Sequence, residues 1–191
     1  MPRLGIFCLE GEWSINLAER ISVEPSLELL ERLKVAKYLH RDYATKGELE
    51  YYLSRHRQAR YSSYKVLFFA AHGAPGCISL DRRESVRLDE LAAMIGPSCD
   101  GKVIYFGSCS ILKVLDEQIT EFAKQTRARA IVGYRKDVDW LDSAAFEIVL
   151  LDAMIRGTRS DGFFNGLIKE HPVVARKLGL VVATKATVHK A

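Results

Sequence analysis

Two points in the sequence combine residue types that could act together as a base and a nucleophile. His72-Gly73 follows an apolar run, residues 66–71, and Cys109 follows a second apolar run, residues 103–106. An imidazole can take up and return a proton, and a cysteine thiolate can attack a carbonyl carbon to form a covalent intermediate. His72 and Cys109 are therefore the candidate base and the candidate nucleophile of an enzyme.

The two apolar runs are the elements that must position these side chains. Short apolar runs bounded by turn residues are typical of buried parallel strands, and open α/β sheets place their sites at the carboxyl ends of such strands. Ser108 and Ser110 flank Cys109 and are too small to block access to it. We expect a helix over residues 113–126, whose first N–H groups could hold an oxyanion, and Gly73 offers a second unobstructed N–H.

The residues around Cys109 exclude three other enzyme classes. A nucleophile elbow needs a glycine two residues after the nucleophile, and Ile111 stands there. Cysteine phosphatases need an arginine shortly after the cysteine, but the first one is Arg127. No Gly-Lys-Ser or Gly-Lys-Thr follows a strand, so the sequence has no phosphate-binding loop of that kind.

Length and charge indicate one domain without a nucleic-acid site. The chain has 191 residues, of which 48% are hydrophobic and 27% charged, and this suits a single α/β domain over residues 1–191 with a core at about 4–183 and a polar tail at 184–191. The net charge of +4 comes from Lys and Arg scattered among Asp and Glu. We read the locally basic residues 55–65 as a solvated helix end or loop, and we expect no nucleic-acid partner.

The cysteines and the apolar segments predict a cytoplasmic protein without a cofactor. The four cysteines show neither a C-x-x-C spacing nor a nearby H-x-x-x-H, so we expect no metal, no cofactor and no disulfide framework. No stretch approaches the ~18 apolar residues of a membrane helix, and the apolar run within residues 1–9 is too short for a signal peptide and is followed by Glu10 and Glu12. We expect the other three cysteines to be packing residues or to lie in exposed loops; these are Cys8, Cys77 and Cys99.

Apolar runs alternate with amphipathic segments along the chain, which predicts a three-layer α/β/α sandwich. Residues 37–43 alternate in charge and suit a strand at the edge of the sheet. We expect strands at 4–9, 37–43, 66–71, 103–106, 130–134 and 178–183, a small hairpin over 77–80 and 86–88, and helices at 25–33, 46–56, 89–95, 113–126, 143–156 and 163–170.

The order of these features resembles the caspase-like cysteine peptidases, and within them most closely the bacterial branch that includes CHAT-type domains. The resemblance rests on an apolar strand, His72-Gly73, a hairpin, a helix, a second apolar strand and Cys109 between small residues. Residues 130–134, followed by Asp139-Trp140 and a helix, are also similar to that family. The resemblance covers about residues 4–183. It implies a six-stranded, mostly parallel sheet in the order 2-1-3-4-5-6, with the last strand antiparallel.

The resemblance also implies an activity and the residues that perform it. Cys109 would be the nucleophile, His72 the general base and acid, and the N–H groups of Gly73 and Cys109 the oxyanion hole for hydrolysis of a peptide bond. In this family the loops after the first and fifth strands form the pocket for the residue before the cut. Acidic residues there favour cleavage after Arg or Lys. Those loops supply Glu10, Glu12, Asp137 and Asp139, with Trp140 as a wall.

Departures from the family pattern leave alternatives open. Gly107-Ser108-Cys109-Ser110-Ile111 replaces the caspase signature, so specificity for aspartate is not supported. The chain shows no linker for activating cleavage and no repeat or sensor domain, so a regulator would be a separate protein. The resemblance to bacterial relatives implies that the peptidase acts in a defence or regulated-death pathway. The alternatives are a non-catalytic caspase-like binding module or partner-activated subunit, and a flavodoxin-like or Rossmann-like domain. Asp137 and Asp139 could instead cap a helix or face solvent.

Overall fold

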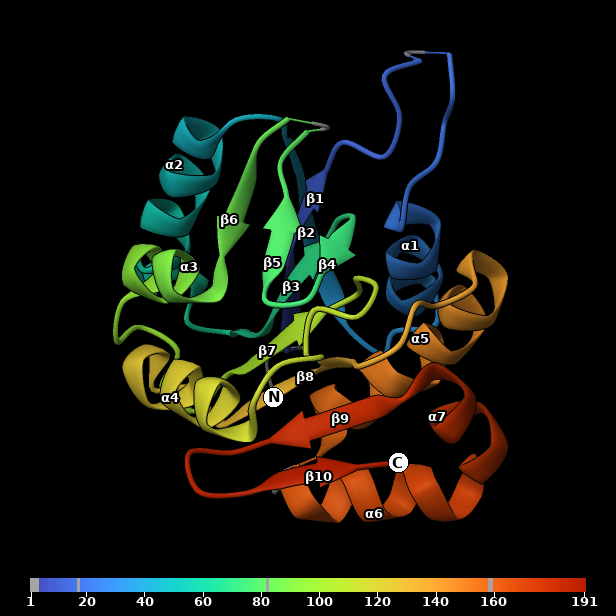
Figure 1. Cartoon of the computed structure of the whole chain (residues 1–191). Coiled ribbons are helices and arrows are strands. Elements are labelled where there is room, and N and C mark those ends of the chain that lie inside the picture. Colours follow the sequence, from blue (N-terminus) through green and yellow to red (C-terminus); the bar gives the residue numbers. More distant parts are fainter. Residues whose placement is uncertain (1–3, 17, 82, 158–159) are drawn as a thin grey trace.

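A seven-stranded sheet forms the centre of the molecule (Figure 1). The structure is a computed structural model that describes residues 4–16, 18–81, 83–157 and 160–191. The strand order is β10-β9-β8-β7-β3-β1-β2. The strands are β1 (Gly5–Gly11), β2 (Lys37–Tyr43), β3 (Tyr64–Ala70), β7 (Val103–Phe106), β8 (Ala130–Tyr134), β9 (Leu180–Ala183) and β10 (Val188–Lys190).

The sheet confirms the predicted fold class and topology. Strands β2, β1, β3, β7 and β8 are parallel, and β9 is antiparallel to β8. These six strands have the expected order, with β2 at the edge as its alternating charges predicted. Strands β3 and β7 are almost wholly apolar because both of their faces are covered by helices.

The prediction of a polar tail after residue 183 is wrong, because β10 pairs antiparallel with β9. The hairpin turn is closed by the Thr184 amide, which donates to the Thr187 carbonyl over 2.8 Å. Lys190 Nζ lies 2.7 Å from Asp116 Oδ2, which attaches the strand to the neighbouring helix. A polar segment can form a strand here because it lies at the edge of the sheet, where one side of the strand faces solvent.

Helices cover both faces of the sheet (Figure 1). One face carries α2, α3 and α4, and the other carries α1, α5, α6 and α7. No helix in the described part of the chain is long and apolar enough to span a bilayer. The helices are α1 (Glu24–Arg32), α2 (Lys46–His56), α3 (Leu88–Ile95), α4 (Asp116–Thr126), α5 (Trp140–Arg156), α6 (Ser160–Glu170) and α7 (Pro172–Leu178), with a 3₁₀ turn at Ala59–Tyr61.

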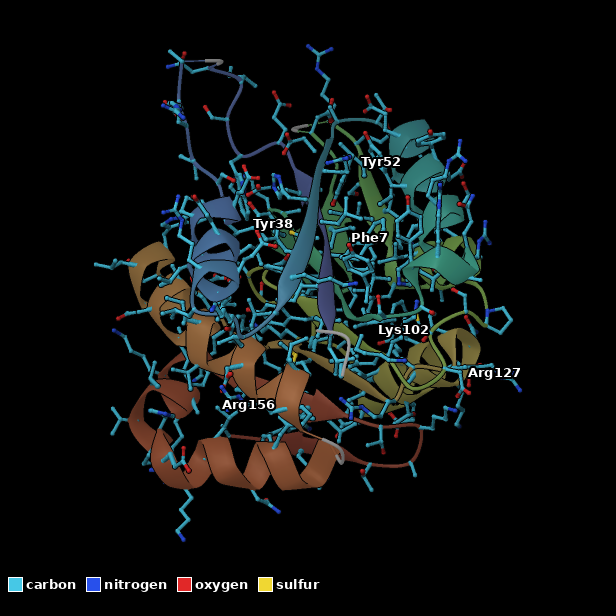
Figure 2. The ribbon with its side chains drawn as sticks, turned by 180° about the vertical axis from the view of Figure 1, so that it is seen from behind. Phe7, Tyr38, Tyr52, Lys102, Arg127 and Arg156 are labelled. Atoms are coloured by element: carbon cyan, nitrogen blue, oxygen red, sulfur yellow. The ribbon has the colours of Figure 1, made fainter. Side chains whose placement is uncertain are left out.

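Two hydrophobic clusters, one on each face, hold the layers together. Figure 2 shows Phe7 and Tyr52 on the side of α2 and Tyr38 on the side of α1. The alternation of side chains along β1 explains this division, because Phe7 faces one cluster while Ile6 and Cys8 face the other.

A second, three-stranded sheet lies beyond the carboxyl end of β3. Its strands are β4 (Gly73–Ala74), β5 (Cys77–Ser79) and β6 (Ser85–Arg87), in the order β4-β5-β6. The pair β5–β6 confirms the predicted hairpin. Strand β4 begins directly after His72 and is hydrogen-bonded to β5, so this small sheet restrains the backbone that carries the imidazole.

The helices differ from the sequence prediction at several boundaries, and one helix was not predicted. Helix α4 begins at Asp116, three residues later than expected, because residues 110–113 form a turn in which the Lys113 amide donates to the Ser110 carbonyl over 2.8 Å. Helix α5 begins at Trp140, since Asp139 caps it. Helix α7 was not expected; Pro172 stands at its start, where proline is well tolerated, and Gly179 ends it in the left-handed region.

Candidate functional site

Four neighbouring strands end at the same edge of the sheet and bring their loops together. Strands β1, β3, β7 and β8 are adjacent and parallel, so the segments after them lie in a row at the carboxyl edge. Their side chains enclose a cavity of about 170 Å³. The cavity is lined by Trp13, Val23, Ala71, His72, Gly107, Cys109, Val138, Trp140, Ser143, Ala144 and Glu147.

A backbone carbonyl orients His72. The ring Nε2 donates to the Trp13 carbonyl oxygen over 2.9 Å, and the ring packs edge-on against the Trp13 indole with centroids 5.1 Å apart. A carbonyl oxygen can only accept, so the Nε2 atom of a neutral ring carries the proton in this arrangement. The Nδ1 atom is then unprotonated and is the nitrogen that can act as a base.

The loop after β8 holds the Cys109 thiol. The Val138 amide donates to Cys109 Sγ over 3.5 Å, and the thiol lies 3.8 Å from the Val138 carbonyl oxygen. These contacts fix the position of the sulfur at the edge of the cavity. Cys109 is half-buried, whereas Cys8 and Cys99 are fully buried. Burial raises the pKa of both, that of Cys99 to about 11, which agrees with their prediction as packing residues.

The loop around Cys109 is attached to its neighbours on both sides. The Ser110 amide donates to the Lys136 carbonyl over 2.9 Å, and the Gly76 amide donates to the Ile111 carbonyl over 3.0 Å. Ser110 has a φ of +40°, in the left-handed region that non-glycine residues rarely adopt. Because α4 starts only at Asp116, the prediction that its first N–H groups adjoin Cys109 is wrong.

The backbone of Gly73 lies directly against the backbone of Cys109. A Cβ atom at position 73 would be 2.5 Å from the Cys109 carbonyl oxygen and 2.8 Å from Ser108 Cβ, so only glycine fits without movement of the loop. Within the described residues, the Cys109 amide has no hydrogen-bond acceptor. An N–H group without an acceptor beside a candidate nucleophile can stabilise an oxyanion.

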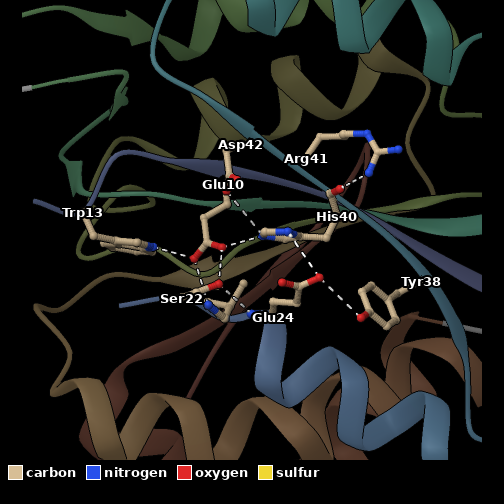
Figure 3. Close-up of polar contacts among 9 residues, drawn as sticks. Glu10, Trp13, Ser22, Glu24, Tyr38, His40, Arg41 and Asp42 are labelled. Atoms are coloured by element: carbon tan, nitrogen blue, oxygen red, sulfur yellow. Dashed lines mark hydrogen bonds and ion pairs between the residues drawn. The ribbon is translucent and has the colours of Figure 1, made fainter. Parts of the chain in front are cut away.

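Glu10 supports Trp13 and does not line the cavity (Figure 3). Its Oε1 accepts from Trp13 Nε1 over 2.5 Å and from the Val23 amide over 2.8 Å. Its Oε2 accepts from Ser22 Oγ over 2.6 Å and interacts with His40 Nε2 over 2.5 Å. Burial opposes ionisation, but these hydrogen bonds, that of His40 first, lower the pKa of the Glu10 carboxyl below its usual value.

Around Glu10 lies the one group of side chains, among the residues that the structure describes, that could hold a metal ion. Glu10, His40 and Asp42 each offer a ligand atom, and these atoms lie within 4.8 Å of one another. Both Glu10 oxygens already accept two hydrogen bonds each, so a cation would have to replace these donors. The arrangement as it stands is that of a buried carboxylate paired with an imidazole.

The remaining residues predicted from sequence lie in different places. Trp140 lines the cavity, and its indole packs edge-on against that of Trp13 with centroids 4.6 Å apart. Glu12 lines a neighbouring hollow of about 260 Å³ that His72 also lines. Asp139 Oδ1 accepts from the Leu141 and Asp142 amides, both over 3.0 Å, and therefore caps α5. Asp137 is exposed and does not line the cavity.

Comparison with protein families places the sequence in a group without an assigned activity. Residues 4–167 match the family of unknown function DUF6642. The chain belongs to this family. A search of curated proteins gives no match for this DUF6642 chain.

Among solved structures, a similar chain is a secreted C11 cysteine protease from Bacteroides thetaiotaomicron, determined in complex with an irreversible peptide inhibitor. The TM-score is 0.55 at 10% sequence identity, and the match covers 96% of the DUF6642 chain and 67% of the protease. The DUF6642 chain therefore has the caspase-like α/β fold that its sequence resembles.

Three features of the DUF6642 site were not among the sequence predictions. These are the Trp13 carbonyl, the Val138 amide and the Glu147 side chain. Backbone groups leave no signature in residue type. Glu147 did leave a signal, because it lies four residues before Leu151 and three before Leu150, on the buried face of α5.

Proposed function

We propose that this protein is a cysteine endopeptidase in which Cys109 is the nucleophile and His72 the general base and acid. The observation that carries the proposal is the cavity at the carboxyl edge of the sheet, which the two side chains line together. The hydrogen bond from His72 Nε2 to the Trp13 carbonyl supports it, because it leaves Nδ1 as the proton acceptor. The caspase-like fold of a C11 cysteine protease is consistent with this chemistry.

The proposed reaction proceeds through a thioester. His72 takes the thiol proton, and Cys109 Sγ attacks the carbonyl carbon of the peptide bond while the Gly73 and Cys109 amides donate to the oxyanion. The C–N bond then breaks, and the amine leaves with the proton from His72. Water, deprotonated by His72, attacks the thioester, and the acid product leaves as the thiol is restored.

The proposed substrate is a protein or peptide that is cleaved after Arg or Lys. The sequence predicts that acidic residues in the loops after β1 and β8 set this preference. The acidic side chain in the cavity beside Cys109 is instead Glu147 of α5. A basic side chain remains the best-matched occupant, because a desolvated carboxylate is stabilised by a cation.

The location, the family branch and the regulation that we propose follow from the composition and from the resemblance to caspase-like peptidases. We place the protein in the cytoplasm of a bacterium, near the CHAT-type branch, with a separate protein as its regulator. A role in defence or regulated death belongs to the same proposal. Neither a nucleic acid nor a membrane is a proposed partner, since the basic residues are scattered.

The experiment that tests the dyad is alkylation of each cysteine by iodoacetamide as a function of pH, read by mass spectrometry. Cys109 should react at pH values below the ~8.5 of an ordinary thiol, and His72→Ala should abolish or shift this reactivity. Cys8 and Cys99 serve as internal controls because they are buried. A Cys109 that reacts like an ordinary thiol and ignores His72 would favour a non-catalytic binding module or partner-activated subunit.

A further inference from the structure

Glu147 is a buried carboxylate that the dyad does not use. It lies on α5, is 5% exposed, and lines the same cavity as His72 and Cys109. Its Oε2 atom lies close to Gly107, since a Cβ built on that glycine would be 3.5 Å away. Its Oε1 atom has no hydrogen-bond partner within the described residues.

A carboxyl oxygen in this position is unusual, because buried polar atoms in folded proteins are nearly always paired. No Lys, Arg or His of the described residues forms an ion pair with Glu147. Tyr105 and Tyr134 lie nearby, with their hydroxyl groups 3.1 Å apart, and a hydrogen bond from Tyr105 acts on the Glu147 carboxyl. Oε1 is therefore the oxygen that remains for a partner entering through the cavity.

The walls of the cavity suit a cation. The indoles of Trp13 and Trp140 meet edge-on with centroids 4.6 Å apart, and both line the cavity. Indole faces attract cations within about 6 Å. At about 170 Å³ the cavity is smaller than the roughly 300–1,000 Å³ of sites for whole small-molecule ligands. Its size suits a single side chain.

We propose that Glu147 determines the specificity of the peptidase by binding the basic side chain of the residue before the scissile bond. This inference rests on the proposed function, and it assigns the recognition to α5 in place of the loops that carry Asp137 and Asp139. Glu147 and Cys109 line the same cavity, so a peptide whose carbonyl reaches the thiol can extend its side chain past the two indoles towards Glu147.

The pKa of the Glu147 carboxyl is consistent with this role. Burial, and next the charge of Glu10, raise the pKa of Glu147 to about 8, while Tyr105 acts in the opposite direction. A cation near a carboxyl lowers its pKa. Entry of a basic side chain would thus release the proton and form a charge-assisted hydrogen bond in a desolvated site.

The test compares two chloromethyl ketone probes that differ only in charge, one with lysine and one with norleucine at the reacting residue. The measured quantity is the rate of covalent labelling of Cys109 by each probe, which requires no substrate turnover. Glu147→Gln removes the charge and keeps the shape. Asp152→Asn is the matched control, because Asp152 lies on the same helix and pairs with Arg156 at the surface.

We expect the wild type and Asp152→Asn to prefer the lysine probe. In Glu147→Gln the ratio of lysine to norleucine labelling should fall about 10- to 100-fold, the range of a hydrogen bond to a charged group, while Asp152→Asn keeps the wild-type ratio. Urea denaturation of Glu147→Gln shows that the variant is folded. Glu147→Asp should keep part of the preference.

Two results separate failure of this inference from failure of the proposed function. If Cys109 is labelled rapidly but the lysine preference is absent or survives in Glu147→Gln, the dyad stands and the role of Glu147 is overturned. If Cys109 reacts with neither probe faster than Cys77 does, and no peptide is cleaved, the peptidase proposal fails and this inference with it.

Discussion

His72 and Trp13 are joined at two points: the His72 ring donates to the Trp13 carbonyl over 2.9 Å, and the two rings pack edge-on 5.1 Å apart. The Trp13 indole in turn donates to Glu10 over 2.5 Å. A buried carboxylate on β1 is thus connected to the candidate base on the loop after β3. This connection links the stability of the first strand to the orientation of the imidazole.

Glu10→Gln should weaken both stability and chemistry. The amide cannot accept four hydrogen bonds, and loss of hydrogen bonds to a charged acceptor reduces the free energy of unfolding by about 1.5–3 kcal/mol each at most. Urea denaturation measures this, and the Cys109 alkylation rate should fall as Trp13 is released. Glu31→Gln, on the exposed side of α1, is the control. Equal stability of the two variants would contradict the role assigned to Glu10.

The Glu10–His40 pair should stabilise the fold only within a window of pH. The pKa of Glu10 is lowered, so its contribution is present above the ordinary carboxyl range and lost as pH falls through the folded value. Burial acts against His40, but its hydrogen bond to Glu10 and the nearby charges raise its pKa, so its contribution is lost as pH rises through that value. The stability difference between wild type and His40→Gln should be largest between these limits. A pH-independent difference would argue against an ion pair.

Gly73→Ala should disable the site because the new Cβ would meet the Cys109 carbonyl oxygen at 2.5 Å. The loop that carries Cys109 must move, so labelling of Cys109 and cleavage of peptides should fall by at least about tenfold, which corresponds to 1.4 kcal/mol. Gly47→Ala is the matched control, since nothing lies within 4 Å of a Cβ there. That control should stabilise α2 by roughly 0.5–1 kcal/mol. An active Gly73→Ala protein would contradict the close approach of the two backbones.

Two substitutions at Asp139 separate helix capping from substrate binding. Asparagine is as good a cap as aspartate, whereas alanine loses the cap at about 1 kcal/mol. If Asp139 only caps α5, Asp139→Asn should keep both the stability and the lysine preference, and Asp139→Ala should lose stability. A loss of the preference in Asp139→Asn would restore the loop as a recognition element. Thermal or urea unfolding measures the stability, and the ratio of lysine to norleucine labelling of Cys109 measures the preference.

Glu147→Gln should become more stable relative to the wild type as pH rises. The folded pKa of Glu147 is about 8, above the roughly 4.3 of an unfolded glutamate. The proton is therefore held more tightly in the folded state, and wild-type stability falls between these values by at most about 1.4 kcal/mol per pH unit. Glutamine does not titrate, so urea denaturation at pH 5 and pH 8 gives the difference. A constant difference would mean that Glu147 is ionised throughout.

The sheet and its order were predictable because burial on both faces leaves a local signature. Residues 103–106 and 130–134 are apolar runs whose bounds match β7 and β8. Parallel strands place their carboxyl ends at one edge, so the proximity of His72 and Cys109 followed from chain order and strand type. The start of α4 was less predictable, because helix ends depend on capping and on loop contacts such as the hydrogen bond from Ser110 to Lys136.

The sequence by itself determined the caspase-like fold class and the two residues of the proposed dyad, since both depend on hydrophobic runs and the residues that follow them. Only the tertiary structure decided which acidic side chains enter the cavity. Glu10 is held by Trp13, Ser22 and His40, and Asp139 caps α5, while Glu147 reaches the site from a helix. The direction of a side chain depends on contacts between distant segments, and no local pattern of residues records those contacts.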